Sequence, residues 1–171
     1  KVEMSWSNCG RGKGSRGRWS LLFWHAQTDT SITGPCIQMV LDIGELEERP
    51  TNKIRGFYGR LKKILPTLYE HRCSVGSKGG FFQRVKKGTW MGHVAEHVAL
   101  ELQTLAGMDT GFGRTRETSE RGVYNVVYSY VVGEAGKRAG ILAVALCEHL
   151  IDQKEYDLEG AIHELKELRE K

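Results

Sequence analysis

The sequence predicts a single α+β domain, an α/β two-layer arrangement in which a mixed sheet packs against helices. Three observations predict it. Short apolar, β-branched runs have the length of strands, and longer segments carry apolar residues at helical spacing. The chain of 171 residues is also 40% hydrophobic, which is enough to bury one sizeable core.

The first half of the chain predicts two strands and one helix. Residues 36–44, CIQMVLDIG, are a strand-length apolar run bounded by proline and glycine. A helix capped by Asn52 and stopped by Pro66 follows. Its apolar residues recur at helical spacing: Phe57, Leu61, Ile64 and Leu65. Residues 71–85 predict a glycine-punctuated turn that leads into a second strand.

The second half predicts helices around one strong strand. Thr89 is a plausible N-cap for a mostly buried central helix over residues 90–106. Residues 108–122 are a polar, glycine-rich loop, too long to serve only as a connector. Residues 123–132, VYNVVYSYVV, are β-branched and aromatic and predict a strand. Residues 134–152 and 157–171 predict two further helices.

The first 36 residues differ from the rest of the chain. Their Gly- and Arg-rich sequence lacks apolar periodicity, which predicts a poorly packed segment in residues 1–36 and a folded domain in residues 37–171. This segment carries five basic and two acidic residues, a net +3 of the chain's +4. Because the domain itself is nearly neutral, nucleic acid is not the expected partner.

The composition also indicates the compartment. No apolar run is long enough to span a membrane, and no signal-peptide pattern opens the sequence. The four cysteines are scattered without a CxxC pair, which is typical of ordinary thiols in a reducing compartment. We therefore expect a cytoplasmic protein without membrane contact. The sequence leaves its oligomeric state open, and a homo-oligomer is one possibility.

The predicted central helix contains an H-x-x-E-H motif: His93, Glu96 and His97. Residues four apart project from the same face of a helix, at a spacing that suits two ligands of one zinc ion. Glu96 shares this face and could take a proton from a water molecule at the metal. The alternative is a structural set of hydrogen-bonded core residues.

A catalytic zinc ion usually has three protein ligands. We expect Glu134, at the start of the helix after the long strand, to be the third, with Glu117 as the second choice. Glu101 lies about 12 Å along the helix axis from His93, too far to bind the same ion. It is predicted instead to orient His97 from behind.

The stretch from Glu70 to Thr118, followed by GVYNVVYSY and EAGKRAG, resembles the N-terminal region of cyanophycin synthetases. Those enzymes build a polymer with a poly-aspartate backbone and arginine on each side chain. The resemblance implies a first module without the ATP-grasp and Mur-ligase-like modules, and so without an ATP site. Its expected partners are the polymer, cyanophycin, and the ligase modules of the full-length enzyme.

The resemblance leaves two functions open. The first is metal-dependent cleavage of the polymer to make primers, because the N-terminal region of some family members resembles a metallopeptidase. The second is a non-catalytic module that docks the polymer or packs against the ligase modules. Because the polymer is zwitterionic, Arg114 and Arg116 are expected to bind its carboxylates, and Glu117 or Glu120 its guanidinium groups.

Overall fold

The structure is a computed structural model that describes residues 2–4, 20–26 and 34–171. The strands of this part are β1 (Val2–Met4), β2 (Ser20–Ala26), β3 (Cys36–Asp42), β4 (Gly113–Glu117) and β5 (Val123–Ser129). The α-helices are α1 (Phe57–Ile64), α2 (Gly80–Lys87), α3 (Met91–Leu105), α4 (Gly133–Asp152) and α5 (Leu158–Glu170). Four short 3₁₀ helices are η1 (Gly44–Glu48), η2 (Thr51–Lys53), η3 (Pro66–Glu70) and η4 (Cys73–Val75).

The strands form one sheet in the order β1-β2-β3-β5-β4, and the predicted α+β class is confirmed. All pairings among the described strands are antiparallel, whereas a mixed sheet was predicted. For β4 and β5 the connection gives the reason. A turn of only five residues joins them, and strands joined so closely pair antiparallel.

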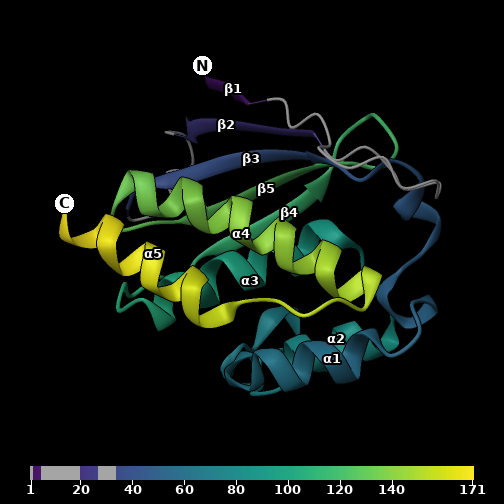
Figure 1. Cartoon of the computed structure of the whole chain (residues 1–171). Coiled ribbons are helices and arrows are strands. Elements are labelled where there is room, and N and C mark those ends of the chain that lie inside the picture. The colour runs from purple at the N-terminus through teal and green to yellow at the C-terminus, as the bar shows by residue number, and fades with distance from the viewer. Residues whose placement is uncertain (1, 5–19, 27–33) are drawn as a thin grey trace.

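The sheet buries one face under helices α3 and α4, and α5 packs on these two helices (Figure 1). Alternate residues of the two central strands point into this core and are fully or nearly fully buried: Ile37, Met39, Leu41, Tyr124, Val126 and Tyr128. Helix α4 contacts β3, and α3 lies beside it against β4 and β5. Most residues of α3 are buried, as predicted for a central helix. Helices α1 and α2 lie beyond it, on the side away from the sheet (Figure 1).

Residues 80–87 form helix α2, not the strand that was predicted. The Phe-Phe and Val of this segment suit either structure, because short apolar runs do not distinguish strand from helix. Tertiary packing selects the helix. Phe81, Phe82 and Val85 lie on one helical face, and all three are buried.

Three other local expectations differ from the structure. The loop of residues 108–122 contains the edge strand β4. Asn52 does not cap α1, which begins after Gly56, but donates a hydrogen bond to the Lys87 carbonyl. Thr89 lies one residue too early to cap α3, and its hydroxyl contacts a histidine of that helix instead.

The N-terminal segment is described only in part. Strands β1 and β2 join the sheet, with β2 paired along its length to β3, where the sequence predicted no regular structure. The residues Leu21 to Trp24 are apolar or aromatic and have good strand propensity, a signal that the Gly/Arg-rich surroundings obscured. The expectations for residues 5–19 and 27–33 lie outside the described residues.

Glycine is required where α2 begins. A Cβ atom on Gly80 would lie 1.9 Å from the Arg72 carbonyl oxygen, so Gly80→Ala must push the turn around η4 away from α2. We expect this overpacking to lower the free energy of unfolding by about 1–3 kcal/mol. Chemical denaturation measures it.

Gly59→Ala is the matched control for this prediction. Gly59 lies inside α1 with nothing within 4 Å of an added Cβ. The substitution is expected to stabilise the protein by about 0.5–1 kcal/mol, because alanine has the higher helix propensity. Equal effects of the two substitutions would contradict the close packing of η4 on α2.

No helix in the described part of the chain combines the length and the apolar character needed to cross a membrane.

Candidate metal centre

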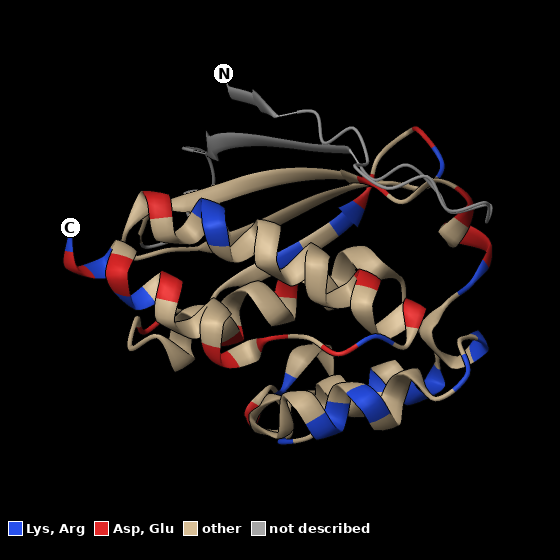
Figure 2. Ribbon diagram, in the orientation of Figure 1, with Lys and Arg blue, Asp and Glu red and all other residues tan. Residues whose placement is uncertain are grey.

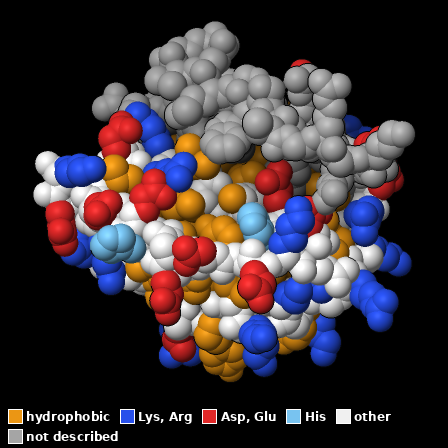
Figure 3. Space-filling model, in the orientation of Figure 1, with side chains coloured by type: hydrophobic (Ala, Val, Ile, Leu, Met, Phe, Trp, Pro, Cys, Tyr) orange, Lys and Arg blue, Asp and Glu red, His pale blue; other side chains and the backbone are white. Residues whose placement is uncertain are grey.

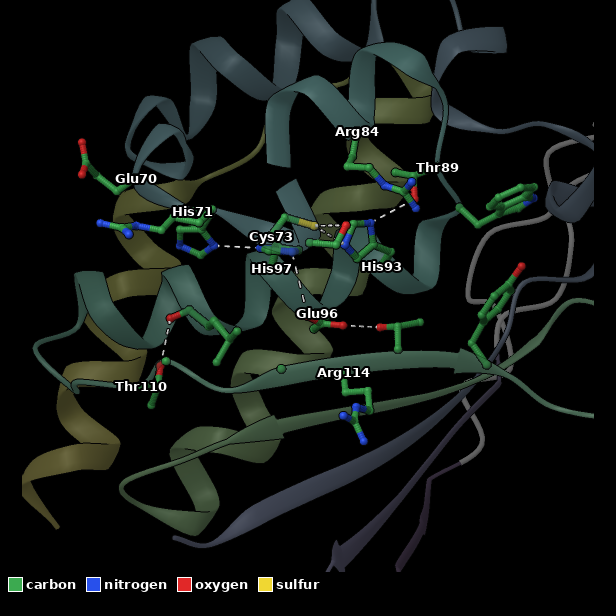
Figure 4. A pocket seen from close by; sticks show the side chains of 18 residues that line it. Glu70, His71, Cys73, Arg84, Thr89, His93, Glu96, His97, Thr110 and Arg114 are labelled. Atoms are coloured by element: carbon green, nitrogen blue, oxygen red, sulfur yellow. Dashed lines mark hydrogen bonds and ion pairs between the residues drawn. The ribbon is translucent and has the colours of Figure 1, made fainter. Parts of the chain in front are cut away.

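The first half of α3 presents His93, Glu96 and His97 to one cleft, as the motif predicts (Figure 4). The Glu96 carboxylate oxygen Oε1 lies 3.9 Å from His97 Nε2. The two imidazole rings meet edge to face, with centroids 4.8 Å apart. The helical spacing therefore brings both ring nitrogens and the carboxylate to one place.

A third side chain, Cys73 of η4, completes this group. Its Sγ atom lies 3.2 Å from His93 Nε2, and one ligand atom each from Cys73, His93 and His97 lie within 4.8 Å of one another. Cys73 has a φ of 53°, a left-handed conformation that is uncommon for residues other than glycine. Such local strain is often found where a side chain is held for function. We call these three residues the Cys–His–His group.

Each imidazole of the group is held by a hydrogen bond to its far nitrogen. Thr89 Oγ1 lies 2.9 Å from His93 Nδ1. His71 Nδ1 lies 2.8 Å from His97 Nδ1, and His71 Nε2 lies 2.8 Å from Glu101 Oε2. With neutral rings, His71 donates to the Glu101 carboxylate and accepts from His97 Nδ1. The Nε2 atom of His97 is then left unprotonated on the side of the cleft.

Phe81 of α2 fixes the rings by packing. It stacks on His97, with centroids 4.1 Å apart, and meets His93 edge to face at 5.7 Å. Sequence reasoning missed Cys73, His71, Thr89 and Phe81 as parts of the site. The adjacent His71 and Cys73, in the sequence HRC, were the available signal, but nothing local connects them with α3.

Strand β4 holds Glu96 from the other side. Thr115 Oγ1 donates a hydrogen bond of 2.5 Å to Glu96 Oε2. A Cβ atom on Gly113 would lie 2.5 Å from Glu96 Oε1, so only glycine lets this strand approach the carboxylate so closely. Burial raises the pKa of Glu96 to about 7, although the Thr115 hydrogen bond works in the opposite direction.

The group lies in a cleft of about 780 Å³ between η4, α2, the start of α3 and β4 (Figure 4). Charged residues of both signs line it, among them Glu70, Arg72, Arg84 and Glu96. Figure 4 shows Arg84 directed toward Thr89 and His93. The cleft therefore offers charged side chains to a ligand in addition to the metal-binding atoms.

The structure does not bring Glu134 to the histidines. Its side chain is 73% exposed and pairs with Lys137 one turn along α4, at 2.7 Å. The first turn of α4 points this side chain to solvent, so Cys73, not Glu134, is the third residue of the group. Glu117, the second choice, is exposed and is not part of the group. Glu101 lies behind His97 as expected, but His71 stands between them.

The predicted polymer-binding residues lie on β4. Arg114, Arg116 and Glu117 are all exposed. In the register with β5, Thr115 pairs with the buried Val126, whereas Arg114 and Arg116 pair with half-buried residues. The two arginines therefore project from the sheet face opposite to the helices.

The charge of the domain is unevenly distributed. Residues 49–90 contain eleven Lys and Arg residues and a single acid, Glu70, a net +10, so the rest of the chain carries −6. Figure 2 shows the basic residues on and around α1 and α2, with acidic residues concentrated on α4 and α5. On the face shown in Figure 3, basic side chains gather at the lower right. The Cys–His–His group borders the basic segment of residues 49–90, because Cys73 lies within it and His93 follows shortly after it.

The Cys–His–His group fits a zinc ion by the chemistry of its donors. Zinc binds thiolate sulfur and imidazole nitrogen, and a catalytic site of this kind has three protein ligands with one position left for water. Hydrogen bonds behind both imidazoles are the usual support of such ligands. Burial lowers the pKa of His93 to about 4, with Arg84 adding to the effect. It also lowers the pKa of His97 well below its ordinary value.

These shifts predict how the stability of the metal-free protein depends on pH. Between pH 6.5 and 4.5 the unfolded chain protonates both imidazoles, whereas the folded chain keeps them neutral and protonates only Glu96. The unfolded state thus binds about one proton more. Stability is therefore expected to fall as the pH falls, by roughly 1 kcal/mol per pH unit.

Urea denaturation of chelator-treated protein at several pH values measures this slope. In Glu96→Gln the opposing protonation is gone, so the slope should become about twice as steep. A flat profile in both proteins would contradict the buried, neutral state of the two histidines.

Fold and site together define the class: an α+β domain with a candidate Cys–His–His metal centre and a buried glutamate in a charged cleft. Residues 38–152 match the family described as the cyanophycin synthase-like N-terminal domain, and the chain belongs to this family. The sequence resemblance is thereby confirmed.

Curated relatives agree with this assignment. The chain is 56% identical over 134 residues to a cyanophycin synthetase of Synechocystis sp. and 54% identical over 134 residues to that of Geminocystis herdmanii. It is 52% identical over 134 residues to that of Crocosphaera subtropica. Each alignment covers 78% of this chain, but the chain spans only 15% of the length of each relative.

Proposed function

We propose that this domain is a metal-dependent peptide hydrolase module that cleaves the aspartate–arginine polymer cyanophycin to make primers. The observation that carries the proposal is the Cys–His–His group with the Glu96 carboxylate 3.9 Å from His97 Nε2, all in one cleft. Zinc suits this donor set best. Cys73, His93 and His97 would hold it, with Cys73 in the role first expected of Glu134.

The chain's own residues support a hydrolytic mechanism. A bound zinc ion would supply Lewis acidity in the cleft. Glu96 takes a proton from the attacking water and delivers it to the leaving nitrogen, a role that a pKa raised to about 7 suits near neutral pH. Thr115 orients this carboxylate. Thr89 holds the His93 ring, and the His71–Glu101 pair holds that of His97.

The substrate is proposed from the relatives' name and from the charges around the cleft. Cyanophycin carries a carboxylate and a guanidinium group on each arginine branch, so a binding surface needs both signs. Arg114 and Arg116 would bind the carboxylates, and Glu117 the guanidinium groups. The ligase modules of a full-length synthetase, in the cytoplasm, would be the other partners.

A second candidate function is polymer docking without cleavage. The observation that favours it is the net +10 of residues 49–90, which offers many cations to the polymer's carboxylates beyond those in the cleft. Such contacts weaken strongly with salt. Docking alone would require neither the metal nor Glu96.

One experiment separates the two functions. Purified zinc-loaded protein is incubated with soluble cyanophycin, and new chain ends are counted by mass spectrometry, before and after chelation. Hydrolysis predicts shorter chains only while zinc is bound, with activity restored by adding zinc back. Polymer that binds but keeps its length in the zinc-loaded protein would leave docking as the function.

A further inference from the structure

Strand β4 is the edge of the sheet and borders the cleft. It pairs only with β5 among the described strands, so its other side presents backbone groups outward. Gly113, Arg114 and Thr115 of this strand line the cleft that holds the Cys–His–His group. An exposed strand edge is a template for an additional extended chain.

The hydrogen-bond pattern determines which β4 residues face outward. Thr118 N donates to Val123 O at 2.8 Å, and Ser129 N donates to Phe112 O at 2.9 Å. In an antiparallel ladder, residues alternate between bonding the partner and facing away. Residues 112, 114, 116 and 118 therefore bond β5. The N–H and C=O groups of Gly113, Thr115 and Glu117 point out of the sheet.

These outward groups lie beside the site. The Thr115 side chain contacts Glu96 at 2.5 Å, and Glu96 lies 3.9 Å from His97 Nε2. A strand added to a sheet lies about 4.8 Å from its neighbour. A chain paired with β4 would thus run directly past Glu96 and the Cys–His–His group.

We propose that the poly-aspartate backbone of the substrate adds to the sheet as a strand on the free edge of β4. This inference rests on the proposed function for the identity of the polymer. Successive side chains of an extended strand point to opposite faces. Half of the arginine branches then enter the cleft, and the other half pass over the opposite sheet face, where Arg114 and Arg116 project.

Pairing with the β4 edge gives Arg116 a role that a ligand confined to the cleft would not. Arg116 projects from the far face of the sheet, and a chain that lies along the β4 edge reaches both faces at once. The edge therefore selects an extended backbone with charged branches, while the cleft selects the bond to be cut.

Hydrogen exchange of individual amides, followed by NMR, tests the pairing. The protein is Glu96→Gln, which should not cut the polymer, and the probe is a soluble oligomer of aspartate with arginine on each side chain. We expect the Thr115 and Glu117 amides to exchange at least about tenfold more slowly with oligomer, while those of Arg114 and Arg116, already bonded to β5, change little. Unchanged exchange at Thr115 and Glu117 under saturating oligomer would overturn the proposal.

A pair of variants supplies a second measurement. Glu117→Pro removes an outward N–H without touching the β5 ladder, and Glu117→Ala removes the same carboxylate but keeps the N–H. Glu117→Pro is expected to bind the oligomer about five- to tenfold more weakly than Glu117→Ala. Equal affinities of the two variants would count against backbone pairing.

The outcomes also separate this inference from the proposed function. Protection of Thr115 and Glu117 in a protein whose wild-type form never cuts the polymer would support the pairing and overturn only the hydrolysis. Cleavage by the wild type without protection in Glu96→Gln would support the hydrolysis and overturn the pairing. Protection that appears without oligomer and grows with protein concentration would assign the edge to a second copy of this chain.

Discussion

Replacing Glu96 with glutamine is expected to lower the rate of cyanophycin hydrolysis by about 10²–10⁴-fold while zinc stays bound. The amide has nearly the volume of the carboxylate and can keep the contact with Thr115, but it cannot accept a proton from water. Initial rates of chain-end formation and the zinc-to-protein ratio of the same sample measure both effects.

Glu134→Gln is the matched control for this substitution. It makes the same chemical change on an exposed glutamate that pairs with Lys137 and lies outside the Cys–His–His group. Its rate and zinc content should equal those of the wild type. Full activity in zinc-loaded Glu96→Gln would exclude Glu96 from the mechanism, and this conclusion would not depend on the role of the zinc ion.

Replacing Cys73 with alanine is expected to abolish both zinc binding and hydrolysis. Loss of a side chain that only supports a ligand typically weakens metal affinity 10- to 100-fold, and loss of a ligand itself should cost more than that. Competition with a chromophoric chelator measures the zinc affinity. His93→Ala should behave in the same way, because it removes another member of the group.

Ser77→Ala tests whether the loss is specific to the thiol. Ser77 is an exposed residue of the turn that follows η4 and does not line the cleft, so the substitution changes a nearby side chain without removing a ligand. It should leave zinc affinity within about twofold of the wild type, because Ser77 is neither a ligand nor a side chain that supports one. Wild-type zinc affinity in Cys73→Ala would exclude the thiol as a ligand.

The part of the site that the sequence predicts correctly lies within one helix. His93, Glu96 and His97 share a face because of their spacing alone, and the apolar residues around them place that helix in the core. Cys73 is twenty residues away in a 3₁₀ turn, and it reaches the histidines because η4 packs on α2. Glu134 follows a confidently predicted strand, but the rotation of α4 about its axis, which points this residue to solvent, depends on packing across the domain.

The fold shows the same division between local and long-range information. The strand at 123–129 and the last two helices follow from periodicity and length, and the structure contains them. Helix α2 and strand β4 were missed for opposite reasons. Phe81, Phe82 and Val85 favour strand and helix equally until α1 and η3 pack on them. The polar sequence of β4 resembles a loop because, as an edge strand, it buries little.

The central claim is that Cys73, His93 and His97 bind one zinc ion, and X-ray absorption spectroscopy of the zinc-loaded protein tests it most directly. The account predicts one zinc per chain, with one sulfur at about 2.3 Å and two imidazole nitrogens at about 2.0–2.1 Å. The sulfur contribution should disappear in Cys73→Ala. A zinc-to-protein ratio near zero under metal-replete conditions, or a zinc shell without sulfur in the wild type, would contradict it.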